Sequence, residues 1–301
     1  LFSARNPHRI TPMFSSSRMA RKFDRISRTA LLTLVWKLSS YHVISFPKSG
    51  RTWVRFFLAS YLSKLAGVPV SMEFKNLFLP HKFVPRVFFS HSGYRGEITG
   101  KMQGGRRIAG GEIPLSVIAE DIPPLLSKNV VFIARDPRDV AVSYYFQLTK
   151  RDAKSGKSAL PEGTTLSVFL RDEAHGIRHI VDYMNLWGAR AREFKTFLLL
   201  RYEDLREDPV TWFGRFVSFL KIPLDQNILK EAVAMADFSR MQEMEKEGEL
   251  GKRVTPGDAS DPESFKVRRG KVGGYADYLS PEDVAYVEEE LKRLDPAFRY
   301  R

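Results

Sequence analysis

Short apolar runs alternate with amphipathic helical patterns over most of the chain. Residues 42–46, 130–134 and 197–200 are compact, mostly apolar runs that end at a turn or at charged residues. Such runs are typical of strands buried on both faces of a parallel sheet. Residues 54–65 and 284–294 instead repeat apolar side chains at steps of three and four, which predicts helices with one buried face. The alternation predicts an α/β fold in three layers, with a central parallel sheet between helices.

A turn over residues 46–53, FPKSGRTW, connects the first predicted strand to its helix. The start of a helix presents unpaired N–H groups and the positive end of the helix dipole, which together favour an anion. The turn adds cations, hydroxyl donors and one residue without a side chain, in the order Lys48, Ser49, Gly50, Arg51 and Thr52. We therefore predict a phosphate-binding loop. The alternative is an ordinary strand–turn–helix connection whose Lys and Arg are solvated.

The same order of strand, turn and helix recurs after residues 130–134. Arg135 follows the strand, Asp136 can cap a new helix, and Pro137 suits the first helical position. Ser143 then lies about two turns along that helix. By itself, the pattern also fits a surface charge at Arg135 and a neutral helical residue at Ser143.

A third segment, residues 265–275, mixes cations with glycines. Glycines permit tight turns and close approach of the backbone to a ligand, so a loop that contains Arg268, Arg269 and Gly270 is a candidate phosphate clamp. A solvated basic loop is the alternative. Phe238 lies at a predicted helix end, where an aromatic side chain usually belongs to the core.

Taken together, these segments resemble the sulfotransferases that use 3'-phosphoadenosine 5'-phosphosulfate (PAPS). Residues 46–53 are similar to the 5'-phosphosulfate loop of that family, with Phe46 for the usual Tyr and Arg51 for the first Thr. Residues 135–145 are similar to its 3'-phosphate motif. The resemblance spans about residues 41–279 in the family order. It implies an α/β fold of the P-loop nucleotide-handling type, with PAPS as donor and adenosine 3',5'-bisphosphate (PAP) as product.

The resemblance also implies roles for individual residues. Residues 268–273 match the family's Arg-Lys-Gly-x-x-Gly signature, with Arg for Lys, while residues 274–276 depart from the Asp-Trp-Lys that follows it. The implied phosphate contacts are Lys48, Ser49, Gly50, Arg51, Thr52, Arg135, Ser143, Arg268, Arg269 and Gly270. The implied adenine contacts are Tyr202 and Phe238, with Trp53 either as a second wall or as a buried anchor of the loop.

Sulfuryl transfer needs a held donor, a deprotonated acceptor and stabilisation of the charge that builds on the departing phosphate. Lys48 projects from the anion loop and is the candidate for the leaving oxygen. His91 is the candidate base because a short apolar strand, residues 87–90, delivers it to the edge of the sheet where α/β proteins bind ligands. Family members usually read Lys-Thr-His there, whereas this chain reads Phe89-Ser90-His91. A structural His91 is the alternative.

A chain of 301 residues, 43% of them hydrophobic, suits one α/β domain. We expect that domain over residues 18–301, led by a basic helix, after a disordered tail or non-native remnant over residues 1–17. Every apolar run is too short to cross a bilayer, so no transmembrane segment is expected. The absence of cysteine excludes disulfides, thiolate zinc sites and a cysteine nucleophile, and it favours a cytoplasmic location.

The net charge of +13 implies attraction to polyanions, which include nucleic acids, acidic membranes and nucleotides. We find no Asp, Glu and His cluster with metal-ligand spacing and predict catalysis without a metal. Besides a sulfotransferase with no nucleic-acid partner, two alternatives stand. One is a nucleotide kinase or NTPase on a similar sheet, which the missing Walker signature disfavours, and the other is a basic nucleic-acid-binding module. The sequence does not set the oligomeric state.

The acceptor cleft is expected between residues 72–96 and 144–180, where aromatic side chains mix with cations. This mixture favours a hydroxyl or amine on a polar or amphipathic small molecule, a sugar or a glycolipid over a purely apolar steroid. Residues 150–157 are interpreted as a mobile loop that can order over the substrate, with a solvated loop as the default.

Overall fold

The computed structural model describes residues 38–67, 85–91, 102–103, 106–107, 115–153, 160–250, 254 and 257–300. The tail expected over residues 1–17 and the basic lead-in helix before the first strand lie outside these residues. Much of the acceptor wall expected over residues 72–96 also lies outside them.

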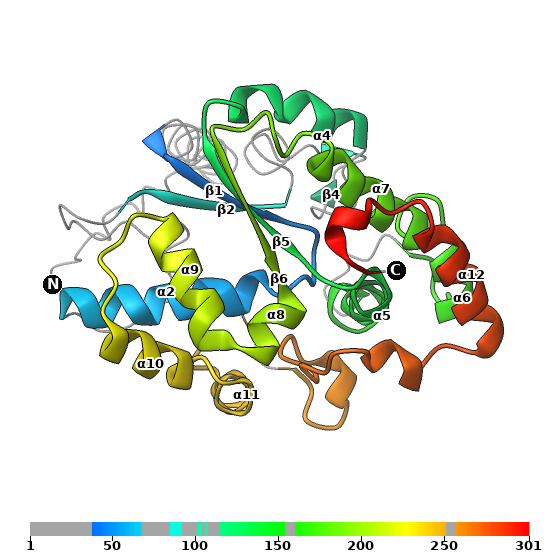
Figure 1. Ribbon diagram of the computed structural model, residues 1–301. Coiled ribbons are helices and arrows are strands. Elements are labelled where there is room, and N and C mark those ends of the chain that lie inside the picture. Colours follow the sequence, from blue (N-terminus) through cyan, green and yellow to red (C-terminus); the bar gives the residue numbers. More distant parts are fainter. Residues whose placement is uncertain are drawn as a thin grey trace, which may run out of the picture.

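Four parallel strands form the central sheet, in the order β2-β1-β5-β6 (Figure 1). They are β1 (Tyr41–Ser45), β2 (Val87–Ser90), β5 (Asn129–Ala134) and β6 (Thr196–Arg201). Each strand forms where an apolar run predicts it. β1 ends one residue before the end of its predicted run because Pro47, which has no N–H group for a ladder, begins the turn. β3 (Met102–Gln103) and β4 (Arg106–Arg107) form a separate antiparallel pair.

One face of the sheet packs on the helices α5 (Pro137–Phe146), α7 (Ile177–Gly188) and α12 (Pro281–Leu291). Ile44 of β1 and Phe132 of β5 point into this layer and are fully buried. Figure 1 shows these helices together on one side of the strands.

The other face packs on α2 (Arg51–Ala66), α9 (Pro209–Phe219) and α10 (Gln226–Met235). Val43 and Val131, the strand neighbours of Ile44 and Phe132, are fully buried on this side. Successive side chains of a strand point to opposite faces, so one apolar run supplies both layers. The predicted three-layer α/β fold with a central parallel sheet is confirmed.

Side chains cap several helix starts, and the cap predicted at Asp136 is confirmed. Asp136, Asp208, Asp225 and Ser280 each accept a hydrogen bond from a backbone N–H in the first turn of α5, α9, α10 and α12, respectively. The remaining helices are α4 (Leu115–Asp121), α6 (Leu166–Arg171), α8 (Tyr202–Glu207) and α11 (Phe238–Lys246). Short 3-10 turns cover Pro123–Leu125, Pro262–Ser264, Gly274–Asp277 and Pro296–Phe298.

The interpretation of residues 150–157 as a loop is wrong for its first part. Gln147–Asp152 forms a π-helix that continues α5. Lys150 Nζ lies 3.1 Å from a carboxylate oxygen of Asp261, and Arg151 Nη1 donates to the carbonyl of Ser264 at 2.7 Å. These contacts tie the segment to a distant part of the chain, which the local composition does not reveal. Residues 154–157 lie outside the described residues.

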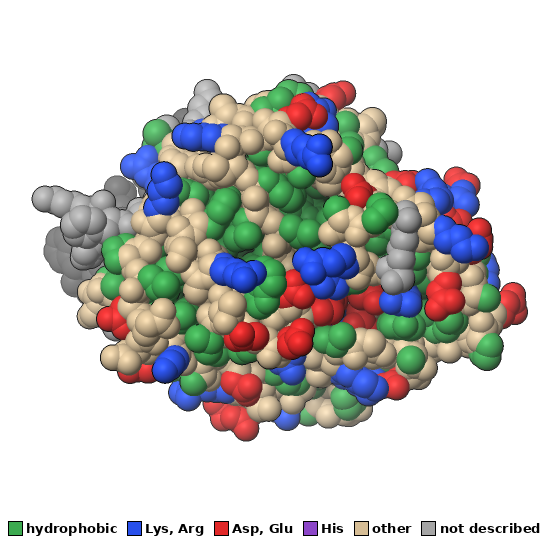
Figure 2. All heavy atoms as spheres, in the orientation of Figure 1, with side chains coloured by type: hydrophobic (Ala, Val, Ile, Leu, Met, Phe, Trp, Pro, Cys, Tyr) green, Lys and Arg blue, Asp and Glu red, His purple; other side chains and the backbone are tan. Residues whose placement is uncertain are grey.

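Among the residues that the structure describes, no helix has the length and apolar character needed to span a bilayer. On the face shown in Figure 2, Lys and Arg side chains are interspersed with Asp and Glu. The excess positive charge therefore forms no continuous basic surface on this face.

Candidate active site

The carboxyl ends of the four parallel strands bring four predicted residues to one edge of the sheet. Lys48 follows β1, His91 follows β2, Arg135 follows β5 and Tyr202 follows β6. All four line one cavity of about 490 Å³. The predicted residues around this cavity are Lys48, Gly50, Arg51, Thr52, Trp53, His91, Arg135, Ser143, Tyr202, Phe238, Arg268, Arg269 and Gly270. Ser49 is the exception, because its side chain is buried and does not line the cavity.

The loop between β1 and α2 opens a helix start toward the cavity. Gly50 has φ +99° and precedes the first residue of α2. A Cβ atom at this position would lie 2.7 Å from the ring of Tyr202, so both the backbone conformation and the close approach require glycine. Within the described residues, no side chain caps this helix and its first turn contains no acidic residue. The amides of this first turn have no helical carbonyl to bind, and they favour an anion.

Lys48 reaches the cavity from a left-handed backbone position, with φ +72°. Its Nζ atom donates to Oε1 of Gln147 at 3.2 Å. Burial, followed by the positive charges of Lys266 and Arg151, lowers the pKa of Lys48 to about 7. Because burial and nearby positive charges disfavour the ammonium form of Lys48, an anion that enters the cavity stabilises it.

Arg135 connects the first loop to the C-terminal clamp segment, residues 265–275. Its guanidinium donates to the carbonyl of Lys48 at 3.3 Å and to that of Lys271 at 3.2 Å. It also lies 4.4 Å from the centre of the Tyr202 ring and 3.5 Å from the carboxylate of Asp139. Lys48 and Arg135 therefore share one cavity and touch through the main chain, as a common nucleotide site requires.

The carboxylate of Asp139 fixes the end of the clamp segment. It accepts hydrogen bonds from the amides of Gly273 and Tyr275, both at 2.9 Å. Ser143, one turn further along α5, is nearly buried and lines the cavity. Helix α5 thus holds the clamp and contributes its own hydroxyl to the cavity wall.

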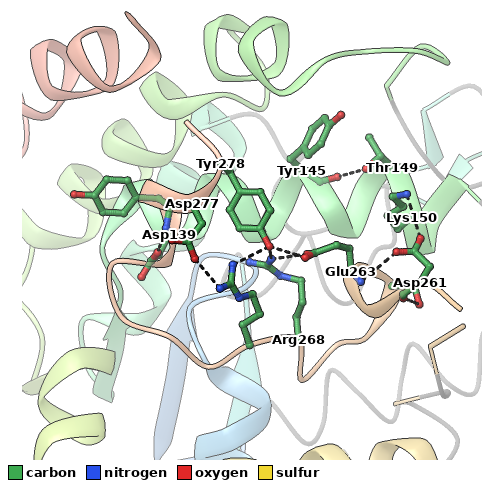
Figure 3. Close-up of polar contacts among 12 residues, drawn as sticks. Asp139, Tyr145, Thr149, Lys150, Asp261, Glu263, Arg268, Asp277 and Tyr278 are labelled. Carbon is green, nitrogen blue, oxygen red and sulfur yellow. Dashed lines mark hydrogen bonds and ion pairs between the residues drawn. The ribbon is translucent and has the colours of Figure 1, made fainter. Parts of the chain in front are cut away.

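Carboxylates and a tyrosine orient the clamp arginines (Figure 3). Arg268 Nη1 lies 2.5 Å from a carboxylate oxygen of Glu263 and 2.7 Å from the hydroxyl of Tyr278. Arg269 pairs with Asp277 at 2.6 Å. These contacts hold both guanidinium groups at the cavity wall.

Aromatic rings line another part of the cavity. Trp53 Nε1 donates to the carbonyl of Ala236 at 2.7 Å, and its ring meets that of Tyr202 edge-on at 5.5 Å between centres. Gly270 has φ +60°, and a Cβ atom there would lie 2.3 Å from the ring of Phe238. Trp53 is thus an anchor of the loop and also part of the cavity wall.

His91 is held in one orientation at the end of β2. Its Nδ1 atom lies 2.7 Å from the carbonyl oxygen of Ser45, and the hydroxyl of Tyr183 donates to the His91 carbonyl. Because a carbonyl only accepts, Nδ1 carries the proton and Nε2 is the basic nitrogen. Burial, followed by the charge of Arg51, lowers the pKa of His91 well below its usual value. The imidazole is therefore neutral at neutral pH, as a general base must be.

Sequence reasoning missed part of the cavity wall. The unpredicted polar residues include Asp139, Gln147, Arg151, Asp152, Arg206, Glu263, Lys266 and Lys271. Lys266 and Lys271 lie inside the segment recognised as a clamp, and their charge is the signal that could have marked them. The others become visible only when distant segments pack together. Among the residues that the structure describes, no group of His, Asp and Glu is arranged to hold a metal ion.

Comparisons with known proteins agree on one family. The family model described as the sulfotransferase domain matches residues 39–294. Cytosolic sulfotransferase 17 of Arabidopsis thaliana is 26% identical over 260 residues, which cover 83% of this chain and 72% of the relative. Sulfotransferase 2A2 of Rattus norvegicus is 26% identical over 204 residues, which cover 67% of this chain and 66% of the relative.

Solved structures share the fold. A mouse sulfotransferase, SULT7A1, complexed with PAP has a TM-score of 0.57 at 18% identity, with 91% of this chain and 93% of that chain covered. Retinol dehydratase in complex with androsterone and the inactive cofactor PAP has a TM-score of 0.58 at 17% identity, with 89% and 84% covered.

Proposed function

The chain belongs to the sulfotransferase family and is a PAPS-dependent sulfotransferase, and we propose that it holds the donor in the cavity at the strand ends. One observation carries this assignment of the site. Lys48, His91 and Arg135 follow three neighbouring parallel strands and line the same cavity. A leaving-group cation, a base and a phosphate-binding arginine are the parts that sulfuryl transfer from a nucleotide needs.

In the proposed binding mode, the 5' end of the donor meets the start of α2. Gly50, Arg51 and Thr52 offer backbone amides, a guanidinium and a hydroxyl there, while the side chain of Ser49 is buried in the turn. Ser49 was predicted as a direct ligand through its side chain, and its burial argues for a contact through the main chain instead.

The 3'-phosphate is proposed to bind Arg135 and Ser143, with the clamp arginines Arg268 and Arg269 beside it. The adenine is proposed to lie among Trp53, Tyr202 and Phe238. The guanidinium of Arg206 lies 5.8 Å from the ring centres of both Trp53 and Phe238, which favours an electron-rich aromatic ligand at this end. Cations and aromatic rings that line one cavity support a nucleotide with phosphates on two positions as the ligand.

The proposed reaction is a direct transfer in which one residue takes a proton and another stabilises the leaving group. His91 Nε2 takes the proton of the acceptor hydroxyl or amine, and the acceptor atom forms a bond to sulfur. The bond between sulfur and the bridging oxygen of the 5'-phosphate breaks, and PAP leaves with that electron pair. Lys48 stabilises the charge on the bridging oxygen as the bond breaks. The transition state carries its charge on oxygens that face fixed cations, so the residues act mainly by position and charge.

For the acceptor, we propose a polar or amphipathic small molecule, with sugars and glycolipids as the first classes to test. The cavity supports this choice because Tyr144 and Phe146 share its wall with Arg151 and Asp152. A solved relative of similar fold carries androsterone, so an apolar steroid belongs in the same screen as the contrasting class. We also propose a cytosolic location, which the names of the plant relatives support.

Turnover assays with PAPS labelled in the sulfuryl group test the function. The protein is expected to transfer label to at least one hydroxyl or amine acceptor from the panel, and to bind PAP in calorimetry. A protein that binds neither PAP nor PAPS would overturn the assignment. The kinase and nucleic-acid alternatives, which the family match does not favour, predict instead ATP hydrolysis or binding to oligonucleotides that weakens steeply with salt.

The role of His91 has its own test. The His91→Ala variant should lose turnover and keep its affinity for PAP, because the base acts on the acceptor and not on the nucleotide. The pKa of His91 lies well below its usual value. The unmodified protein should therefore lose activity in acid only at a pH below 6.5, as measured in its pH–rate profile. Turnover that survives in His91→Ala would exclude this residue as the base.

A further inference from the structure

Lys266 is a cation in the cavity wall that has no role in the reaction as proposed above. Its ammonium makes no hydrogen bond and no ion pair with the part of the chain that the structure describes. Its neighbours in the clamp segment differ. Arg268 pairs with Glu263 at 2.5 Å, and Lys271 pairs with Asp277 at 3.0 Å. A cation kept at a cavity wall beside carboxylate-paired neighbours is available to an anionic ligand.

The main chain at Lys266 is fixed by a buried carboxylate. Glu245 of α11 has no solvent exposure, and its two oxygens accept the amides of Lys266 at 2.7 Å and Val267 at 2.6 Å. Arg151 Nη1 lies 3.3 Å from the same carboxylate and donates to the carbonyl of Ser264. Three segments far apart in the sequence thus hold one lysine in position.

Lys266 lines the same cavity as Lys48 and His91, the residues proposed to act on the reacting groups. The charge of Lys266 is the largest charge effect on Lys48, and it also acts on the imidazole of His91. Burial, followed by the charges of Arg51 and Arg151, lowers the pKa of Lys266 itself to about 8. Lys48, His91 and Lys266 line the same cavity from three different segments, and an anion in that cavity would relieve the mutual repulsion of the two lysines.

We propose that Lys266 is a further catalytic residue, whose ammonium contacts the non-bridging oxygens of the sulfuryl group while Lys48 serves the bridging oxygen. This proposal rests on the proposed function. It adds no atom to the reaction, since the acceptor–sulfur bond still forms, the bond from sulfur to the bridging oxygen still breaks, and the proton still goes to His91. Strand β2, which delivers His91, supplies no cation of its own. Lys266 brings a cation to the same cavity from the clamp segment.

Binding of PAPS and PAP in the absence of acceptor separates this role from a general effect on the nucleotide. PAP lacks the sulfuryl group and has otherwise the same contacts. The Lys266→Met variant should therefore bind PAPS about tenfold more weakly, the loss expected for one charge-assisted hydrogen bond. Its affinity for PAP should change much less. Lys266→Arg keeps the charge and should restore most of the PAPS affinity. Lys246→Met removes an exposed lysine of α11 outside the cavity and should leave both affinities unchanged.

The outcomes distinguish this proposal from the proposed function. An unmodified protein that binds neither nucleotide overturns the proposed function. If the unmodified protein binds both nucleotides, and Lys266→Met lowers the affinities for PAPS and PAP equally or lowers neither, only the role of Lys266 is overturned. Thermal unfolding of each variant checks that the fold is intact, and the charge-retaining Lys266→Arg decides the question if Lys266→Met fails to fold.

Discussion

The starts of helices α2 and α5 look alike in the sequence and differ in the structure. Both follow a buried parallel strand and a short turn, and both contribute to the same cavity. Among the described residues, α2 begins with no side-chain cap, behind a glycine at φ +99°. Helix α5 begins with Asp136, whose carboxylate accepts the amide of Arg138 at 2.9 Å and pairs with the guanidinium of that residue at 2.7 Å.

The difference shows two ways to meet a phosphate at a strand end. An uncapped helix start offers its amides and its dipole to the ligand. A start that is already occupied by its own carboxylate repels an anion, so α5 must contact phosphate through side chains beside that start. Arg135 before the cap and Ser143 two turns beyond it both line the cavity. The same local pattern thus gives a backbone site in α2 and a side-chain site in α5.

The largest effect is expected at the α2 start, where the chemistry takes place. Lys48→Ala should lower kcat by about 10²–10³, the range measured when one donor to a developing oxyanion is removed. Steady-state turnover with labelled PAPS measures it. If the variant kept its kcat and changed only KM, Lys48 would be a binding residue and not a leaving-group residue.

Arg135→Ala tests the side-chain site. Loss of one charged hydrogen-bond partner costs about 1.5–3 kcal/mol, so PAP should bind about tenfold to a hundredfold more weakly. Adenosine 5'-phosphate, which is PAP without the 3'-phosphate, serves as the matched ligand, and its affinity should change much less. Equal losses for both ligands would show that Arg135 acts on the loop through its contact with the Lys48 carbonyl, and not on the 3'-phosphate.

Removal of the α5 cap tests stability and not catalysis. Asp136→Ala should lower the free energy of unfolding by about 0.5–2 kcal/mol, as for other helix caps. Ser49→Ala, in the turn before the uncapped α2, should have a smaller effect because Ser49 caps no helix. Denaturant unfolding of both variants makes the comparison. A Ser49→Ala variant destabilised as much as Asp136→Ala would remove the distinction between the two starts.

The smallest effect is a dependence of nucleotide affinity on pH. Because the pKa of Lys48 is about 7 in the ligand-free protein, most of its side chain is neutral at pH 8. An entering anion favours the charged form, so binding takes up a proton and PAP affinity should fall about fivefold from pH 7 to pH 8. Calorimetry in buffers of different ionisation enthalpy measures this uptake, and Lys48→Ala should reduce it. Proton release on binding would contradict the lowered pKa.

Features set by neighbouring residues could be predicted from the sequence. The apolar runs predicted the four strands, and Asp136 marked the start of α5 because capping depends on residues only a few positions apart. The residues directly after the strands could be placed at one edge because parallel strands end together. For these parts, the local chemistry and the final fold agree.

Other features depend on distant segments and could not be predicted in this way. The cluster of Arg151, Glu245 and Lys266 joins a π-helix, α11 and the clamp segment, and no local pattern links them. The pairing of Arg268 with Glu263 and Tyr278 likewise follows from how the clamp folds back on itself. The part of the site that we propose to act on the sulfuryl group belongs largely to this second kind.

A crystal structure of the protein with PAP tests the central claim most directly. The account predicts the 5'-phosphate at the start of α2 beside Lys48, and the 3'-phosphate on Arg135 and Ser143, within one continuous cavity. A nucleotide bound outside this cavity, or bound with its two phosphates exchanged between the two helix starts, would contradict it.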